Sequence, residues 1–229
     1  MSVSLSACQS ASKADNTTEQ KSQTEQITKE ITTIENADKG QIKDGNKALV
    51  AYFTYSENIG DTSGMSVDAV SSASLNRKTD NKSGNLQVMA QVIQEQAGAD
   101  GFQILVCEPY DSDYDVMRER AYKELDNGSF PELQSTVENL ADYDVVYLGT
   151  PVWSGKMPRP VASFLKENDL SGKTIIPFGI NLGSGFGSIL QEMRETSPDA
   201  NIIDGFTINA STDNDEVRNE FTDWLNNQQ

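Results

Sequence analysis

From residue 47 to the end of the chain, short β-rich runs alternate with runs of helical periodicity. Residues 47–53 (KALVAYF) form a continuous apolar run typical of a buried strand, and Leu86, Met89, Val92 and Ile93 follow at helical spacing. Further strands are expected at 102–107, 144–148, 174–178 and 202–208, and further helices at 114–125, from Pro158, at 187–196 and at 215–225. This order predicts an α/β fold with three layers, in which a doubly wound, five-stranded parallel sheet has helices on both faces.

Charge and residue usage exclude several classes of function. The chain has 18 Lys plus Arg against 35 Asp plus Glu, a formal net charge of −17, and no histidine. Such a polyanion repels phosphate backbones and anionic lipid, so we expect no nucleic-acid binding. Without histidine there is no Ser-His-Asp or Cys-His catalytic set, and Cys8 and Cys107 are too far apart for a Cys-x-x-Cys motif. We therefore predict no catalytic side chain and no metal ligand, and expect a bound cofactor to supply the chemistry.

The N-terminal stretch differs from the rest of the chain. Residues 9–44 are mostly Ser, Thr, Gln, Glu, Lys and Asn. Residues 1–44 hold five Lys and seven acidic residues, which leaves a net charge of −15 on residues 45–229. Because residues 9–44 contain too few apolar side chains to offset the entropy of ordering, they are predicted to be a disordered polar tether before a domain at 45–229.

The first eight residues contain a short motif that bears on the localisation of the protein. Leu5-Ser6-Ala7-Cys8 resembles the lipobox of bacterial lipoproteins, in which the cysteine is lipidated. A basic n-region and an apolar h-region are missing, so residues 1–8 are interpreted as the remnant of a truncated signal, with a chance match as the alternative. A lipid on Cys8 predicts an extracytoplasmic, membrane-anchored protein, and a cytoplasmic location is the alternative.

In an open parallel sheet, ligands bind beyond the carboxyl ends of the strands. The loop after the first strand is Thr54-Tyr55-Ser56-Glu57-Asn58, and after a polar insert the next helix begins at Ser83-Gly84-Asn85. Hydroxyls together with the free N–H groups of a helix N-terminus favour an anion. Ordinary capping of the helix by Ser and Gly is the alternative interpretation.

Two further loops open at the same predicted edge. The loop after the third strand carries Trp153 between proline and glycine, which predicts an exposed aromatic plate for stacking on a planar ring. A tryptophan packed onto its own sheet is the alternative. The loop after the fourth strand contains Gly183-Ser184-Gly185, whose small residues let the backbone approach a ligand closely.

These loops resemble those of the flavodoxin family. The resemblance rests on Phe53-Thr54-x-Ser56, Ser83-Gly84-Asn85, Pro151-x-Trp153-x-Gly155-x-Met157-Pro158, Ser171-Gly172-Lys173-Thr174 and Gly183-Ser184-Gly185. It covers about residue 47 to the C-terminus and is greatest with flavodoxin-like proteins of anaerobic bacteria, some of which are lipoproteins. It implies strand order 2-1-3-4-5 and FMN as the cofactor.

The resemblance also implies which residues surround FMN. The phosphate would be held by Thr54, Tyr55, Ser56, Gly84 and Asn85. One side of the ring would be lined by Pro151, Val152, Trp153, Gly155 and Met157, and the other by Gly183, Ser184 and Gly185. This chain departs from the family at Leu86, where relatives have a threonine, and at Asn181-Leu182, where they often have His-Glu. The insert at 57–82 is a candidate lid.

The predicted function is FMN-dependent electron transfer with a positively charged redox partner or a small quinone. One alternative is an FMN-dependent NAD(P)H:quinone or nitro reductase, and another is a flavodoxin-fold binding module that has lost its cofactor. Two smaller predictions concern single residues: Cys107 is expected to be a core residue of the second strand, and Asp113 to cap a helix rather than bind calcium.

Overall fold

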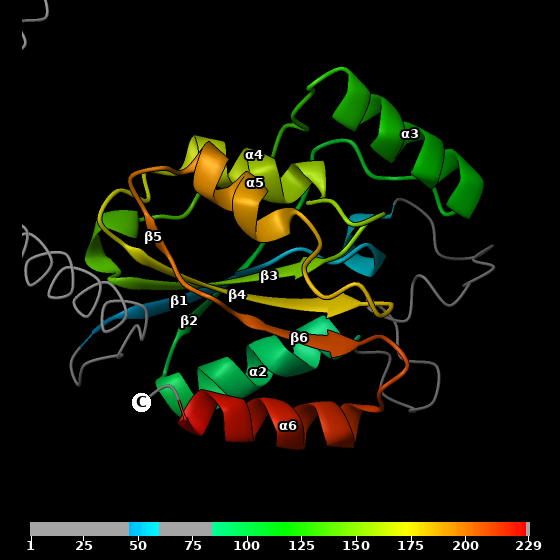
Figure 1. Cartoon of the computed structure of the whole chain (residues 1–229). Helices are drawn as coiled ribbons and strands as arrows, with labels where there is room; N and C mark the ends of the chain where they lie inside the picture. The colour runs from blue at the N-terminus through cyan, green and yellow to red at the C-terminus, as the bar shows by residue number, and fades with distance from the viewer. Residues whose placement is uncertain (1–45, 60–83, 228–229) are drawn as a thin grey trace, which may run out of the picture. The chain divides into compact units, whose positions relative to one another are not determined.

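The strands lie side by side between two layers of helices (Figure 1). The structure is a computed structural model that describes residues 46–59 and 84–227. The predicted signal remnant with Cys8, the tether and most of the candidate lid lie outside these residues.

Every pair of neighbouring strands is parallel, in the order β2-β1-β3-β4-β5, and β6 also pairs with β4. The strands are β1 (Ala48–Tyr52), β2 (Asp100–Gln103), β3 (Val145–Pro151), β4 (Thr174–Asn181), β5 (Asn201–Ile202) and β6 (Phe206–Asn209). The helices are α2 (Asn85–Ala97), α3 (Tyr114–Asp126), α4 (Arg159–Glu167), α5 (Ile189–Thr196) and α6 (Asn214–Asn226), with 3₁₀ turns η1 (Ser56–Asn58) and η3 (Leu140–Asp142). The predicted doubly wound parallel sheet and its 2-1-3-4-5 order are confirmed.

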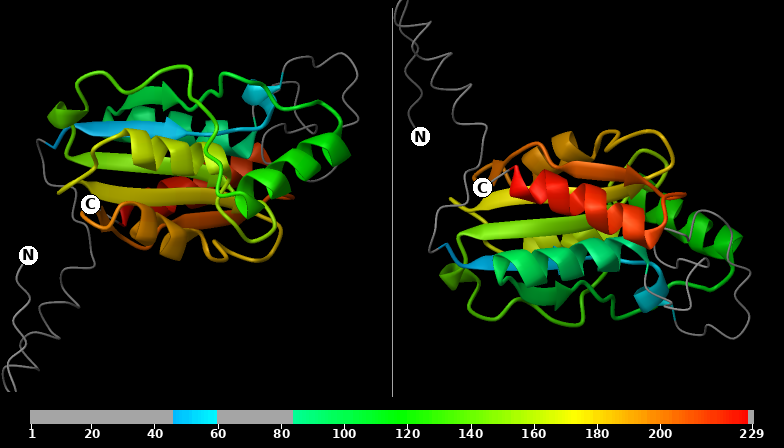
Figure 2. Two further views of the ribbon diagram at one scale, coloured as in Figure 1. Left: turned by 90° about the horizontal axis from the view of Figure 1, so that it is seen from above. Right: turned by 90° about the horizontal axis from the view of Figure 1, so that it is seen from below.

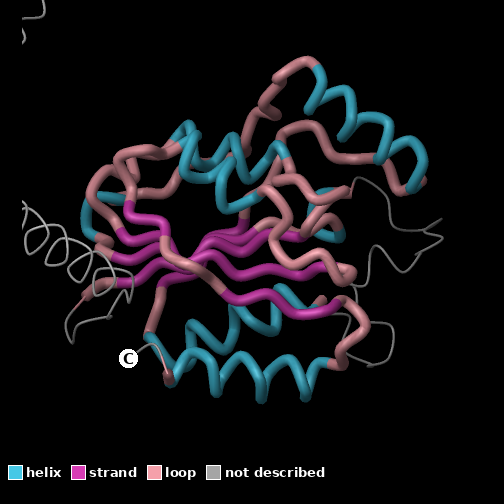
Figure 3. The backbone as a smooth tube through the Cα atoms, in the orientation of Figure 1, coloured by secondary structure: helices cyan, strands magenta, loops and turns pink. Residues whose placement is uncertain are grey.

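The sheet separates two hydrophobic cores, because alternate side chains of a strand point to opposite faces. From β1, Leu49 and Ala51 enter the core covered by α4 and α5, whereas Val50 and Tyr52 enter the core covered by α2 and α6. The views from above and below show these helix layers on the two faces of the sheet (Figure 2). Helices lie on both sides of the strands (Figure 3). Both faces of β1 and β3 are therefore buried, which explains their largely apolar sequences.

The predicted fifth strand at 202–208 is two strands, and Pro177 gives the reason. Ile203 donates its N–H to the carbonyl of Ile175, so odd-numbered residues of β4 face this neighbour. Pro177 is the next such residue and has no N–H to donate. The ladder therefore stops after β5 and resumes at β6, with Gly205 packed so closely on Pro177 that a Cβ would lie 1.8 Å from its carbonyl oxygen.

The predicted second strand is wrong in its position. It was expected at 102–107, whereas β2 ends at Gln103. Ile104 and Val106 are buried, but Val106 forms an antiparallel bridge with Leu133 in place of a rung of the parallel sheet. Their apolar character reflects burial under a loop, and Cys107, predicted to be a core residue, is exposed.

Helix ends follow the expected signals. The Asp113 carboxylate accepts hydrogen bonds from the N–H groups of Asp115 and Val116 at the start of α3, which confirms the capping role. Asp213 caps α6 in the same way through the N–H of Glu216. Pro158 directly precedes α4, where its missing N–H costs no helical hydrogen bond.

Candidate functional site

Strands β1, β3 and β4 end next to one another at one edge of the sheet. Tyr52 pairs with Gly149 and Pro151 pairs with Ile180, so the loops that follow these strands start side by side. The order β2-β1-β3 places the reversal of winding between β1 and β3. In doubly wound sheets, ligands bind at this reversal.

The loop after β1 is held in shape by Asn58, which is almost fully buried. Its side-chain amide donates to the carbonyls of Thr54 (2.8 Å) and Ile104 (3.1 Å), and its carbonyl oxygen accepts from the N–H of Val106 (2.8 Å). The sequence interpretation gave Asn58 no role. These contacts fix the 3₁₀ turn η1 and thereby the positions of the hydroxyl groups of the loop.

The polar groups of this loop form a short hydrogen-bonded chain. The Thr54 hydroxyl donates to Glu57 Oε2 at 3.0 Å and lies 3.3 Å from the Ser56 hydroxyl. Gln103 Nε2 donates to Glu57 Oε1 at 2.8 Å. Burial raises the pKa of the Glu57 carboxyl, and the hydrogen bonds from Thr54 and Gln103 lower it in part.

Helix α2 begins with Gly84 as its N-cap. Asn85 is fully buried and donates from its side-chain amide to the carbonyl of Thr212 (2.9 Å), which ties the start of α2 to the loop after β6. Leu86 is fully buried in the core. Amides of the first helical turn have no partner within the helix and carry the positive end of the dipole, so this end suits an anion.

A tight turn presents Trp153 at the end of β3. The N–H of Trp153 donates to the Lys156 carbonyl (3.1 Å), and the N–H of Lys156 donates to the Trp153 carbonyl (2.9 Å). Ser154 and Gly155 both have positive φ, 52° and 76°, which identifies a type I′ turn. The turn is tied to α5, because Glu192 accepts from the N–H of Met157 (3.2 Å) and pairs with the Lys156 ammonium (3.4 Å).

Trp153 was predicted to be an exposed aromatic plate, and in the structure it is partly buried. Its ring packs edge-to-face against Phe53 (5.4 Å between centroids), Tyr110 (5.6 Å) and Tyr55 (6.5 Å). The Tyr55 hydroxyl donates to the carbonyl of Asp111, and burial, with the nearby carboxylates of Asp111 and Asp113, raises the pKa of Tyr55 to about 12. These contacts hold one side of the Trp153 ring in place.

The other side of Trp153 faces a cavity of about 220 Å³. Val152, Trp153, Ser154 and Leu182 line it from the loops, and Tyr114, Met117, Arg118, Ala121, Tyr122 and Leu125 line it from α3. The Tyr122 hydroxyl lies 2.9 Å from the Ser154 hydroxyl and joins the helix to the turn. The sequence interpretation missed this wall, although Met117, Ala121 and Leu125 fall at helical spacing on one face.

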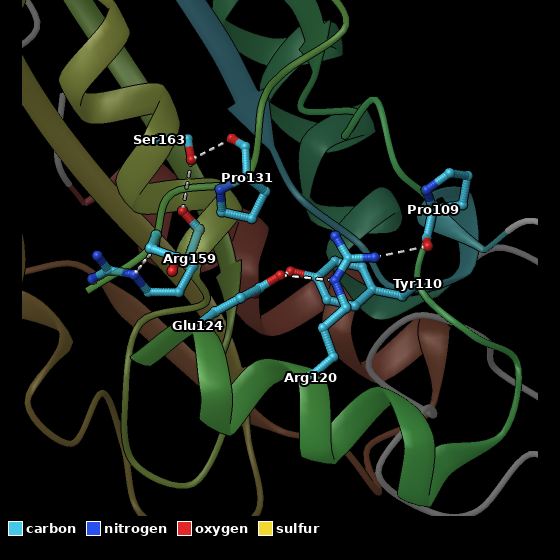
Figure 4. A network of polar contacts seen from close by, with 8 residues as sticks. Pro109, Tyr110, Arg120, Glu124, Pro131, Arg159 and Ser163 are labelled. Atoms are coloured by element: carbon cyan, nitrogen blue, oxygen red, sulfur yellow. Dashed lines mark hydrogen bonds and ion pairs between the residues drawn. The ribbon is translucent and has the colours of Figure 1, made fainter. Parts of the chain in front are cut away.

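Polar contacts in the C-terminal half of α3 and just beyond the helix hold this wall in place (Figure 4). Glu124 accepts from the Tyr110 hydroxyl (2.7 Å) and from Arg120 Nε (2.8 Å), and the Arg120 guanidinium lies 4.2 Å from the centre of the Tyr110 ring. Beyond the helix, Arg159 Nε donates to the carbonyl of Ser129 (2.7 Å). Burial raises the pKa of Tyr110, so its hydroxyl stays protonated and serves as the donor to Glu124.

The glycine-rich loop after β4 is shaped by Asn181. Gly183 and Gly185 have positive φ of 104° and 59°, and nothing lies within 4 Å of where a Cβ would be at either position. Asn181 is buried, and its Oδ1 accepts from the N–H of Gly183 at 2.6 Å. Asn181 thus organises the loop from inside, while Leu182, 61% exposed, contributes to the cavity.

The structure places the predicted site residues at several different positions along this edge. Val152 and Trp153 line the cavity, and the loop beside it contains Gly183, Ser184 and Gly185. Thr54 and Ser56 lie in the loop after β1. Pro151 and Met157 are buried beneath the surface, and Gly155 faces the loop of α5. Tyr55 directs its side chain toward Asp111 and Trp153.

Comparison with protein families finds one relationship. The family model described as flavodoxin matches residues 79–228, which is more than half of the chain. A comparison with curated proteins finds no match.

Solved structures include several with the same fold. A protein described as a flavoprotein from Bacteroides eggerthii DSM 20697 has 27% identity and a TM-score of 0.57, covering 80% of this chain and 97% of its own. One from Bacteroides uniformis ATCC 8492 has 24% identity and a TM-score of 0.59 over 80% and 99%. A flavoprotein from Lactobacillus acidophilus NCFM, crystallised with FMN, has 19% identity and a TM-score of 0.54 over 71% and 93%. At these identities the last two show the fold alone.

Proposed function

The chain belongs to the flavodoxin family, and from this premise we propose that it binds FMN and transfers electrons. The observation that carries the proposal is the meeting of two features at the carboxyl edge of β1 and β3. One is the loop after β1, which carries the hydroxyls of Thr54 and Ser56, and the other is the cavity beside Trp153. Flavodoxins are themselves a known example of a sheet that binds FMN at this point of reversal.

The residues at this edge fit the chemistry of the cofactor. Hydroxyls and the N-terminus of α2 suit a phosphate in a loop without a basic side chain among its described residues. Trp153, Leu182 and the α3 wall offer apolar surface for a planar ring, and the glycines at 183 and 185 leave open space for close approach. When bound, FMN supplies one- and two-electron chemistry.

The protein's own contribution is orientation, exclusion of water and electrostatics. The α3 side chains that line the cavity shield the place of the flavin ring from solvent. The turn at Trp153 fixes one face of that place. Residues 45–229 carry a net charge of −15, which disfavours additional negative charge in the site. The same field attracts a positively charged redox partner.

A second candidate is an FMN-dependent NAD(P)H:quinone or nitro reductase. It is favoured by the exposed apolar side chains at the mouth of the cavity, Tyr122 (45% exposed) and Leu182, beside which a flat substrate such as a small quinone can lie. Steady oxidation of NAD(P)H by the flavin-loaded protein with a quinone acceptor would support this candidate. Its absence, with flavin bound, favours the electron carrier.

We further propose that the chain is anchored outside the cytoplasm by a lipid on Cys8, with residues 9–44 as the tether. Among the described residues, no helix has the length and apolar character needed to cross a membrane. Expression in bacteria from the native gene, as the wild type and as Cys8→Ser, tests this proposal. Membrane recovery of the wild type alone supports the anchor, and equal recovery in the soluble fraction favours a cytoplasmic protein.

Addition of FMN to the full chain tests the main proposal. We expect quenching of FMN fluorescence and a shifted visible spectrum that saturate at one flavin per chain. A protein that leaves FMN fluorescence unchanged would instead be a cofactor-less binding module of the flavodoxin fold.

A further inference from the structure

A carboxylate lies among the hydroxyl groups that are proposed to meet the phosphate. Both oxygens of Glu57 accept hydrogen bonds, Oε2 from Thr54 (3.0 Å) and Oε1 from Gln103 (2.8 Å). Glu57 is partly buried. It is therefore a fixed part of the loop, unlike the solvated acids elsewhere on the surface.

The direction of these hydrogen bonds matters because a hydroxyl has one proton to donate. Thr54 uses its proton on Glu57. In the 3.3 Å contact between Thr54 and Ser56, the Ser56 hydroxyl is then the donor. With Glu57 ionised, the Thr54 proton is directed toward the carboxylate and away from an incoming anion.

We propose that Glu57 sets the preference of this site between phosphorylated and unphosphorylated flavins. The ionised carboxylate weakens binding of FMN relative to riboflavin, which has no phosphate, and neutralising Glu57 restores the preference for FMN. The inference rests on the proposed function, since it concerns the same flavin site.

Protonation of Glu57 reverses its hydrogen bond with Thr54. The carboxyl O–H donates to Thr54, and Thr54 no longer directs its own proton at Glu57. Protonation also removes a negative charge that repels the phosphate. Binding of FMN is therefore accompanied by uptake of a proton at Glu57, whereas binding of riboflavin is not.

The surroundings of Glu57 do not neutralise its charge. Glu57 faces Thr54 in its own loop and Tyr52 at the end of β1. From β2 it faces Gln103, which also donates to the Tyr52 hydroxyl (2.8 Å). Burial raises the pKa of Tyr52, so this group is neutral at physiological pH. In the described part of the chain no basic side chain contacts Glu57, and the pKa of its carboxyl is raised by burial.

The test measures the affinities of the full chain for FMN and for riboflavin by quenching of flavin fluorescence at pH 5.5 and 8. The variant is Glu57→Gln, whose amide mimics the protonated carboxyl. Glu138→Gln is the matched control, because it removes the same charge from an exposed position in the segment that leads into β3 at the opposite edge. At pH 8 we expect Glu57→Gln to bind FMN about tenfold more tightly than the wild type, the effect of one hydrogen bond to a charged group.

Riboflavin affinity should change less than twofold in Glu57→Gln, and the advantage for FMN should shrink at pH 5.5. Equal FMN affinities of the wild type and Glu57→Gln, or an equal gain in Glu138→Gln, would overturn the inference and leave the proposed function intact. Failure of the wild type to bind either flavin would instead refute the proposed function. If Glu57→Gln does not fold, as judged by circular dichroism, Glu57→Ala makes the same comparison.

Discussion

The carbonyl oxygen of Gly155 accepts a hydrogen bond from the N–H of Ser188 at 3.0 Å, and the Ser188 hydroxyl lies 2.9 Å from the same oxygen. This contact joins the turn that presents Trp153 to the start of α5. Ser188→Ala should lower the free energy of unfolding by about 1 kcal/mol and weaken FMN binding, because the turn loses one anchor. Urea unfolding and FMN titration measure the two effects. Ser135→Ala, at an exposed position, should stay within about 0.5 kcal/mol of the wild type.

The loops after β3 and β4 approach so closely that one glycine has no room for a side chain. At Gly187 (φ 57°) a Cβ would lie 2.4 Å from the Gly155 carbonyl oxygen, whereas at Gly128 (φ 62°) nothing lies within 4 Å. Both alanine variants incur the left-handed backbone cost of about 1 kcal/mol, but only Gly187→Ala adds a backbone clash. Gly187→Ala should therefore be clearly less stable in urea than Gly128→Ala. Equal losses would contradict the close contact of the two loops.

Two buried tyrosines provide a contrast in hydrogen bonding. The Tyr147 hydroxyl is buried and has no hydrogen-bond partner among the described residues, whereas the Tyr110 hydroxyl donates to Glu124 at 2.7 Å. Tyr147→Phe should leave stability unchanged or raise it by about 1 kcal/mol, because it removes an unsatisfied polar group. Tyr110→Phe should destabilise the protein by about 1 to 3 kcal/mol, because it removes the donor to the buried Oε2 of Glu124. Thermal unfolding compares them, and a greater loss in Tyr147→Phe would refute this account.

The pKa of Glu57 makes stability depend on pH. Burial raises it above the unfolded value, near 4.5, so the folded protein holds this proton more tightly. The resulting contribution to stability is complete below pH 4.5 and is lost as pH rises through the folded pKa. The free energy of unfolding of Glu57→Gln, relative to wild type, should therefore rise between pH 4 and pH 7.5. Urea unfolding without flavin measures it, and a constant difference would show that the carboxyl is not desolvated.

The order of strands and helices could be predicted from the sequence because burial of a strand or a helix face leaves a local pattern of apolar residues. Strands β1 and β3 are buried on both faces and read as apolar runs, and Asp113 and Asp213 mark helix starts that the structure has. The prediction failed where an apolar residue outside a strand is buried by a loop. Val106 pairs with Leu133, a contact that no local pattern encodes, so the second strand was placed too late.

The candidate site was predictable only in part for the same reason. The loops could be located from strand ends, but the packing of Trp153 against Phe53 and Tyr110 depends on segments distant in sequence. The α3 wall and the hydrogen bond from Thr54 to Glu57 likewise depend on tertiary placement. Residue types suggested the cofactor, while tertiary contacts decided which side chains are available to hold it.

The two tryptophans of the chain allow the most direct test of the central claim, that a flavin ring binds beside Trp153. Trp224, in α6 on the opposite face of the sheet, stacks on Phe221 with 5.4 Å between centroids and serves as the control. FMN is titrated into the full chain, into Trp153→Ala and into Trp224→Ala, with folding checked by circular dichroism. We predict one FMN per wild-type chain, about tenfold weaker binding in Trp153→Ala from the lost ring contact, and less than a twofold change in Trp224→Ala. Equal affinities of the two folded variants, or no binding by the wild type, would contradict the claim.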